Sequence, residues 1–371
     1  MFNFFQNIRV GLFLGYRDLK RANKWTVFLI LVVMMLTFLN LVVVSGILVG
    51  IIEGSVQSNR RFYSGDIIIS NLKEKDYILR AQDMIAYIKG SSDVKSFSPR
   101  YIESGRAEEN YKDRRGKNER IDSVSTLVTG INVEEELRVS NIDSKIVEGR
   151  FLKQDDFDKI VVGSNLLFKY TSADAPGITL LKSVELGDTV RLTIDDKVRE
   201  VEIIGVIKSK AGEVDRRIYM PDTYLRSWLN KVDLNVNEIA IKVHDQSRVP
   251  VLQSNLKEQG FDRFANIQNA EESLPQFLND IKTTFSILGA VIGGIGLVVA
   301  SITIFIVIFI NAVSRRRSIG ILKGIGITAQ AIEFSYIFQA IFYSLIGTAV
   351  AIVIIYALLI PYFMENPLDF P

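Results

Sequence analysis

The sequence predicts a membrane protein with three spanning α-helices and a large extracytoplasmic α/β domain. Three long stretches contain no charged residue: 26–52, 283–314 and 334–364. Each exceeds the roughly 20 apolar residues that cross a bilayer core as a helix. Residues 53–282 instead carry most of the charged side chains, in patterns typical of strands and helices. The 48% hydrophobic and 23% charged residues are thus segregated along the chain.

The charges flanking the apolar stretches predict their orientation. Residues 1–25 hold five basic side chains against one acidic, and the loop 315–333 holds four against one, whereas residues 53–282 have a net charge of −3. Short basic flanks stay in the cytoplasm. We therefore expect a cytoplasmic N-terminus and 315–333 loop, with the 53–282 domain and the 365–371 tail outside. Basic clusters also bind nucleic acid, but their position beside apolar stretches favours membrane lipid as the partner and no nucleic acid.

Residues 1–25 have the pattern of an amphipathic helix that lies on the cytoplasmic membrane surface. Apolar side chains recur at three- and four-residue spacing and basic side chains take the other side. The apolar set is Phe5, Ile8, Leu12, Tyr16 and Leu19. The alternative is that the segment only sets the topology.

Glycines at four-residue spacing lie in the first two apolar stretches. The first stretch and its end contain Gly46, Gly50 and Gly54, and the second contains Gly289 and Gly293. This spacing is typical of close helix packing in lipid. A nucleotide-binding glycine motif would need a preceding strand, so we interpret these glycines as helix-packing residues.

The outer region 53–282 is expected to contain two βαβ halves with a β-rich insertion at about 150–230 between them. The halves are predicted as strand, helix and strand at 66–70, 77–88 and 94–102, and again at 238–244, 249–259 and 261–267. The insertion strands are predicted at 160–162, 188–194, 199–207 and 217–220. The polar segment 103–122 is expected to be a loop. Residues after Pro275 lack Pro and Gly up to the second apolar stretch, which predicts one long helix.

The residue inventory argues against an enzyme. The chain has no cysteine and its single histidine, His244, ends an alternating strand. These residues supply no histidine or cysteine metal cluster, and no P-loop motif is present to bind ATP. The runs at Asp155–Asp158 and Asp195–Asp196 do not match a calcium loop and are interpreted as turn and cap residues. We therefore expect no catalytic, metal or cofactor site, and an outer-face hydrolase is nearly excluded.

The loop 315–333 combines basic and apolar side chains where a soluble loop would be polar. Three arginines precede a short apolar segment that includes Ile319, Ile321 and Leu322. Apolar groups at a cytoplasmic surface indicate a docking site for a partner. The alternative is a turn that lies against lipid. The candidate docking residues are Arg315, Arg316, Arg317, Ile319, Gly320, Ile321, Leu322, Lys323, Gly324 and Gly326.

This loop resembles the signature segment of the FtsX-like permeases, the membrane subunits of the MacB, LolC/LolE and FtsX class of ABC transporters. The family pattern R-x-R-E-I-G-I-L-R-A-[IL]-G-A stands here as R-R-R-S-I-G-I-L-K-G-I-G-I, with Ser318 in place of Glu and Gly324 in place of Ala. The outer region resembles the MacB-like core through GRFL at 149–152, IVVGSNL at 160–166 and VELGDTV at 184–190. Family members have four membrane spans, whereas three are predicted in this sequence.

The resemblance implies a permease subunit without catalysis of its own, in the bacterial cell (inner) membrane. A separate ABC ATPase would use the ATP and dock on the 315–327 surface. A second permease, identical or a paralogue, would complete the transporter, and a membrane-fusion protein or lipoprotein chaperone is a further expected partner. The roles implied are efflux, lipoprotein release or control of cell-wall hydrolases. The alternative is a membrane-anchored sensor or scaffold whose outer domain binds a ligand without ATP coupling.

Overall fold

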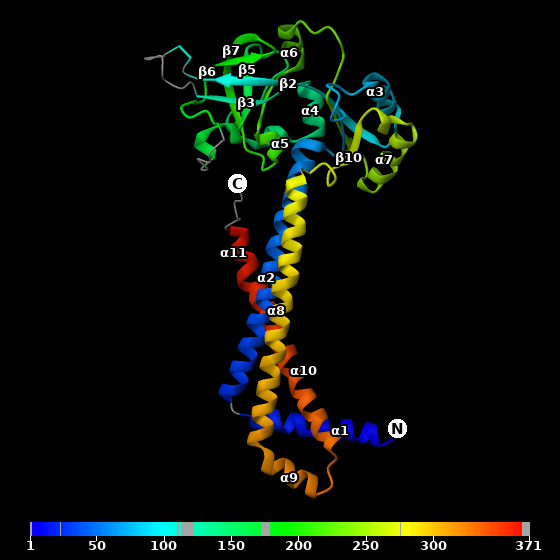
Figure 1. The fold of residues 1–371 in the computed structure, drawn as a ribbon, viewed down its shortest axis with the longest axis vertical. Helices are drawn as coiled ribbons and strands as arrows, with labels where there is room; N and C mark the ends of the chain where they lie inside the picture. The colour runs from blue at the N-terminus through cyan, green and yellow to red at the C-terminus, as the bar shows by residue number, and fades with distance from the viewer. Residues whose placement is uncertain are drawn as a thin grey trace. The chain divides into compact units, whose positions relative to one another are not determined.

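The computed structural model describes residues 2–22, 24–109, 111–112, 122–171, 179–274 and 276–365. The chain divides into two compact units, a set of long helices and a domain that contains the strands, and Figure 1 labels the elements of each. Among the described residues, one unit runs to Ile51 and resumes at Asn279, and the other comprises Ile52–Leu278. The two units are described separately below.

Among its described residues, the first unit is mainly helical and contains three helices long and apolar enough to cross a membrane, judged by length and composition. The apolar segments are Lys24–Val43, Ser286–Ser314 and Ala329–Glu365. This arrangement confirms the predicted class of three apolar helices beside a large α/β domain. The helices are α1 (Phe2–Arg21), α2 (Lys24–Asn59), α8 (Gln276–Ser314), α9 (Arg316–Gly324), α10 (Ala329–Ile354), the π-helical η7 (Ile355–Leu359) and α11 (Ile360–Glu365).

Three glycines that were not among the expected packing residues make close helix contacts in this unit. A methyl group built on Gly11 or Gly15 of α1 would lie 2.6 or 2.8 Å from Phe334 or Phe338 of α10. Gly347 of α10 approaches Met34 of α2 in the same way, at 2.6 Å. Small residues allow helix backbones to come this close. The contacts therefore fix α1 and α2 on α10.

The expected packing glycines behave differently within the chain. A methyl group on Gly46, Gly50 or Gly54 would meet no described atom within 4 Å. Of the second pair, Gly293 would approach Leu41 at 3.0 Å, and Gly289 lies nearby on α8. The α2 glycines therefore make no close contact with the described part of the chain. A role for them in packing against a second chain remains a prediction.

The second unit contains a four-stranded ferredoxin-like arrangement. Strands β1 (Ile67–Ser70), β2 (Val94–Glu108), β9 (Glu238–Val243) and β10 (Asn266–Asn269) lie in the order β10-β1-β9-β2, each antiparallel to its neighbour. Helix α3 (Ala81–Gly90) connects β1 to β2, and α7 (Val249–Glu258) connects β9 to β10. Each connection skips one strand, as in split βαβ units. The two predicted βαβ halves are therefore present and interleaved.

The insertion closes into a barrel. Strand pairings run from β2 through β3, β8, β5, β7 and β6 and back to β2, with the β3–β8 and β5–β7 pairs parallel. The ring therefore uses β2 and β3 in addition to strands from the predicted insertion. These strands are β3 (Ser123–Ile131), β5 (Lys159–Gly163), β6 (Thr189–Ile194), β7 (Lys197–Ile207) and β8 (Arg217–Pro221), with β4 (Ile146–Gly149) paired to β7 outside the ring.

Short helices and turns complete the second unit. They are the π-helical η1 (Arg60–Ser64), α4 (Val133–Val139), η2 (Ile142–Lys145), η3 (Ser164–Leu166), η4 (Phe168–Tyr170), α5 (Gly212–Asp215), α6 (Asp222–Leu229), η5 (Gln246–Arg248) and η6 (Phe261–Arg263). The β6–β7 turn has positive φ at both Asp195 and Asp196, which is typical of the tight turns that match strand twist. This confirms the predicted turn there.

Apolar side chains bury both faces of the ferredoxin-like sheet. Ile67 and Ile69 of β1 pack with α3 and α7, whereas Ile68 points to a core that also contains Phe62 and Tyr63 of η1. Alternate residues of a strand point to opposite faces, so a continuous apolar run indicates a strand covered on both sides. The segment that directly follows α2 is therefore part of the outer domain's core.

Two element predictions were wrong. Residues 103–108 are not a loop but continue β2, because all six pair with β3, the last four also pair with β6, and Ala107 is fully buried. Residues 110 and 113–121 of that predicted loop lie outside the described residues. Residues 261–263 form η6 instead of a strand, since Gly260 ends α7 with positive φ and Phe261 packs into the α3–α7 core. The last strand begins only at Asn266.

Candidate functional site

The predicted docking residues lie together on α9 and its flanking turns. All nine residues of α9 are described and none is buried. Ile321 and Ile325 are 61% and 71% exposed, and the side chains of Arg316 and Arg317 are also exposed. Ile319 and Leu322 are half-buried. The helix therefore presents apolar and basic groups on one exposed element.

The glycines of this segment differ in whether the backbone conformation requires glycine. Gly320 and Gly324 have no described atom near the position of a Cβ. Gly326 has φ of +95°, a conformation that favours glycine, and it lies in the turn between α9 and α10. The following Thr328 caps α10 by accepting a hydrogen bond from the Ala331 N–H. Gly326 thus allows the sharp turn that separates the two helices.

Arg315 differs from its neighbours because it already has an intramolecular partner. It precedes α9, and its guanidinium forms an ion pair with Asp18 of α1 at 2.5 Å. The pair borders a small cavity that is also lined by Tyr336, Gln339 and Tyr343 of α10. Arg315 therefore points into the helical unit, whereas Arg316 and Arg317 remain exposed.

A second polar contact joins α1 to the turn after α9. The Asn7 amide donates to Gln330 Oε1 at 2.9 Å, and the Thr328 hydroxyl donates to Asn7 Oδ1 at 2.8 Å.

Asn7 and Asp18 were not identified from the sequence, and neither were the glycines that pack α1 against α10. The G-L-F-L-G spacing of Gly11 and Gly15 was a usable signal, because it repeats the small-residue spacing of close helix pairs.

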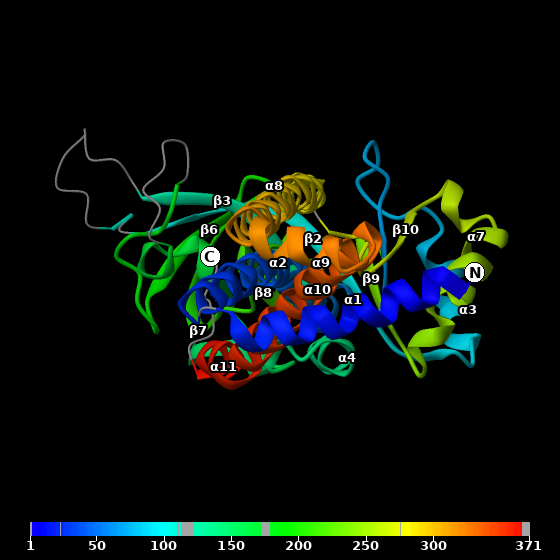
Figure 2. The same cartoon turned by 90° about the horizontal axis from the view of Figure 1, so that it is seen from below.

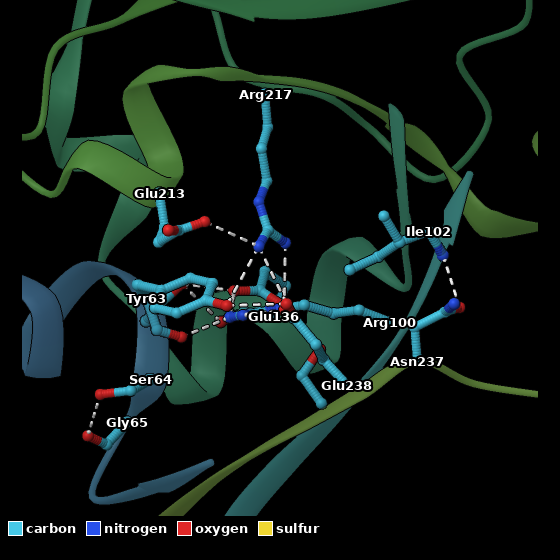
Figure 3. Close-up of polar contacts among 12 residues, drawn as sticks. Tyr63, Ser64, Gly65, Arg100, Ile102, Glu136, Glu213, Arg217, Asn237 and Glu238 are labelled. Atoms are coloured by element: carbon cyan, nitrogen blue, oxygen red, sulfur yellow. Dashed lines mark hydrogen bonds and ion pairs between the residues drawn. The ribbon is translucent and has the colours of Figure 1, made fainter. Parts of the chain in front are cut away.

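The outer domain contains a buried ion network that no sequence pattern had identified (Figure 3). Arg100 of β2 makes a bidentate contact with Glu136 of α4, at 2.9 and 2.7 Å, and donates to Glu238 of β9 at 3.3 Å. Arg217 of β8 donates to both oxygens of Glu238, at 2.9 and 3.1 Å. The network therefore connects the ferredoxin-like strands to the inserted region.

The segment after α2 is part of this network. Arg100 Nη2 donates to the backbone carbonyl of Tyr63 at 2.6 Å, and the Tyr63 hydroxyl donates to Glu238 Oε1 at 2.7 Å. Gly65, two residues on, has φ of +64°, and a Cβ there would lie 2.5 Å from the Ile241 carbonyl oxygen. Hydrogen bonds and close packing therefore fix η1 to β2 and β9.

Electrostatics keep the network ionised. Burial alone would raise the pKa of Glu238, but Arg217 and Arg100 lower it to about 2. Burial opposes ionisation of Glu136 in the same way, and Arg100 with two serine hydroxyls lowers its pKa below the usual range. Buried charges are stable only when paired and hydrogen-bonded. The sequence signal was a single charged residue in an apolar strand, as in Arg217-Ile-Tyr-Met and Glu238-Ile-Ala-Ile.

The other candidate polar residues have structural surroundings. Asp156 accepts hydrogen bonds from the guanidinium of Arg150 and from the Lys153 N–H, and Arg150 lowers its pKa. His244 is exposed at the end of β9. Within the described ranges, no three His, Cys, Asp or Glu side chains are grouped to hold a metal ion.

Comparison with known proteins supports the family resemblance. Residues 290–371 match the family model described as FtsX-like permease C-terminal. Over 165 residues the chain is 29% identical to the macrolide export ATP-binding/permease protein MacB of two Campylobacter jejuni strains, 81-176 and NCTC 11168. Each match covers 41% of this chain and 25% of that protein. The matched region thus spans about a quarter of the length of these curated relatives.

Two solved structures align with the chain at low similarity. The extracellular domain of the ABC-type transporter YknZ from Gram-positive bacteria aligns with 16% identity and a TM-score of 0.35, covering 55% of this chain and 99% of that one. The periplasmic region of MacB from Actinobacillus actinomycetemcomitans aligns with 19% identity and a TM-score of 0.35, covering 59% and 91%. The sequence similarities are those of an FtsX/MacB-type ABC transporter permease, a membrane protein with an extracytoplasmic domain.

The lowered pKa of Glu238 predicts acid-sensitive stability. Its contribution is complete above the ordinary value of 4.5 and is lost as pH falls towards 2. Glu238→Gln should lower stability at pH 7 by about 3–5 kcal/mol, because Arg217 loses its buried partner. The same variant should weaken the dependence of stability on pH between these values. Urea unfolding followed by Trp228 fluorescence, in a Trp25→Phe background, measures both effects.

The matched control is Glu134→Gln, which removes an exposed ion pair with Arg138 on α4. Exposed pairs contribute about 0.2–1 kcal/mol. Equal destabilisation by the two variants, or an unchanged pH dependence in Glu238→Gln, would show that the network does not stabilise the domain as described.

Proposed function

We propose that this chain is the permease subunit of a MacB/FtsX-type ABC transporter. It transmits the ATP-driven movement of a separate ATPase to its extracytoplasmic domain. The observation that carries this proposal is α9, a short helix with exposed isoleucines beside exposed arginines and no buried residue. A helix that buries none of its side chains within its own chain is well suited to bury them against a partner.

The composition of α9 fits a protein partner. Ile321 and Ile325 offer apolar contact area, while Arg316 and Arg317 offer charge complementarity that orients a partner. The family resemblance makes this partner an ABC ATPase, so ATP is consumed by the partner and this chain needs no cofactor. A lipid-facing turn, the alternative, accounts for the isoleucines without requiring any soluble partner.

The elements that follow α2 support transmission of movement. Helix α2 runs unbroken from Lys24 to Asn59 and continues directly into η1. Tyr63 of η1 is hydrogen-bonded to Arg100 and Glu238 inside the outer domain. Movement of α2 along its axis therefore acts on a segment that is fixed in the core of the domain rather than on a loose tether.

We infer that the working transporter contains two permeases, as the family resemblance implies. A Cβ on Gly46, Gly50 or Gly54 of α2 would meet no described atom within 4 Å, so these glycines leave space for close packing by the second permease, identical or a paralogue. The outer domain would act on its substrate outside the membrane. Efflux, lipoprotein release and control of cell-wall hydrolases all fit this geometry, with a membrane-fusion protein or lipoprotein chaperone as the further partner.

The proposed multi-pass orientation in a bacterial cell membrane is tested by cysteine labelling, since the native chain has no cysteine. Cysteine at Ser58 should react with an impermeant maleimide in intact cells, or in spheroplasts where an outer membrane is present. Cysteine at Ser318, in the exposed α9, should react only after lysis. Labelling of position 318 from outside would reverse the orientation and remove α9 as a cytoplasmic docking surface.

The docking proposal is tested by co-purification with the host's own ABC ATPase. Arg316→Glu combined with Arg317→Glu should reduce retention of the ATPase by at least about tenfold. The two introduced carboxylates would be repelled by a partner surface that is complementary to the arginines. The matched control reverses two exposed charges on α1, with Arg17→Glu and Lys20→Glu, and should retain the ATPase. A wild-type chain that retains no ATPase would favour the sensor or scaffold hypothesis.

A further inference from the structure

We infer that α1 is a positioning element for α9, holding this helix, which has no fully buried residue, at both of its ends. This inference rests on the proposed function only in assigning α9 to ATPase docking. The structural part stands on contacts within the helical unit, where α1, α9 and the start of α10 lie close together (Figure 2).

The first contact fixes the N-terminal end of α9. Arg315 lies between α8 and α9, and its carbonyl accepts a hydrogen bond from the Ile319 N–H in the first turn of α9. Its guanidinium pairs with Asp18, the only acidic residue among residues 1–52. The ion pair with Asp18 therefore fixes the position of Arg315, the residue that immediately precedes α9.

The second contact fixes the C-terminal end. Thr328 ends the turn after α9. Its hydroxyl acts as both donor and acceptor, donating to Asn7 Oδ1 and accepting from the Ala331 N–H. The Asn7 amide also donates to Gln330. One α1 side chain thus bonds both residues that flank the start of α10.

The spacing of the two contacts matches the helix they hold. Asn7 and Asp18 are 11 residues apart on α1, which corresponds to about 16 Å along a helix. The nine residues of α9 correspond to about 13 Å. Helix α1 is therefore long enough to reach both ends of α9, and the close approach of Gly11 and Gly15 to α10 keeps it in place.

The position of α9 depends on these contacts because little else holds it. A nine-residue helix is marginal on its own in water, and α9 buries none of its side chains. The Asp18–Arg315 pair has both side chains 35% exposed. An ion pair this exposed contributes only weakly to stability, so it can break and re-form during a cycle and positions the helix only together with the other α1 contacts. Arg315 is consequently a positioning residue, unlike its exposed neighbours Arg316 and Arg317.

A charge swap tests this inference with a readout that does not require the ATPase. Spin labels on cysteines at Lys323 of α9 and Ile341 of α10, both exposed, report the distance between the helices by pulsed electron paramagnetic resonance. Asp18→Arg or Arg315→Asp alone should broaden the distance distribution, and the two together should narrow it again. Asp18→Asn is a milder variant that removes the charge without introducing repulsion, and should broaden it too.

The same variants are then assayed with the ATPase. Each single change should raise the permease concentration for half-maximal ATPase stimulation by about fivefold with unchanged maximal rate, and the double swap should restore it. Unchanged distance distributions in the single variants, or no recovery in the double swap, would overturn the inference. If the wild-type chain does not stimulate any ATPase, the proposed function fails, while the distance measurement still decides the role of α1.

Discussion

The outer domain depends on the burial of Arg100. A guanidinium removed from water is stable only when its donors are satisfied, and its partners come from three separate segments: the Tyr63 carbonyl after α2, Glu136 of α4 and Glu238 of β9. None of these bonds can be lost without leaving a buried charge short of partners. The requirement ties the start of the domain, its ferredoxin-like strands and its inserted region into one arrangement. Arg217 extends that arrangement to the barrel through β8.

The two ends of the proposed relay differ in how firmly they are held. At the outer domain, η1 is buried in apolar contacts and bonded through both the backbone and the hydroxyl of Tyr63. In the helical unit, α9 has no fully buried residue, and the residues that flank it, Arg315 and Thr328, are bonded to α1 through polar groups. Regions with few buried contacts open and move most easily. The proposed docking helix therefore lies at the end of the relay that moves more easily.

The sequence revealed the features that follow from local periodicity, including the apolar helices, the two βαβ halves and most strands of the insertion. It could not reveal features that depend on distant partners. A single charge in an apolar strand marks Glu238, but its partner Arg100 is identified only once the fold brings the two together. Closure of the barrel requires β2 to pair with β3 and β6, while β2 also pairs with β9 in the ferredoxin-like sheet. The α2 glycines were conspicuous yet meet no described neighbour, whereas Gly11 and Gly15 lay unnoticed in a segment interpreted as interfacial.

The central claim is that movement received at α9 reaches the outer domain through η1. Hydrogen exchange on the membrane-embedded complex with its ATPase, with and without ATP under conditions that block hydrolysis, tests this directly. The amide of Asp66, bonded to the Ile241 carbonyl, and that of Val243, bonded to the Asp66 carboxylate, report on the base of the domain. The account predicts that ATP changes exchange at both amides as well as in α9. Changes confined to α9 would contradict it.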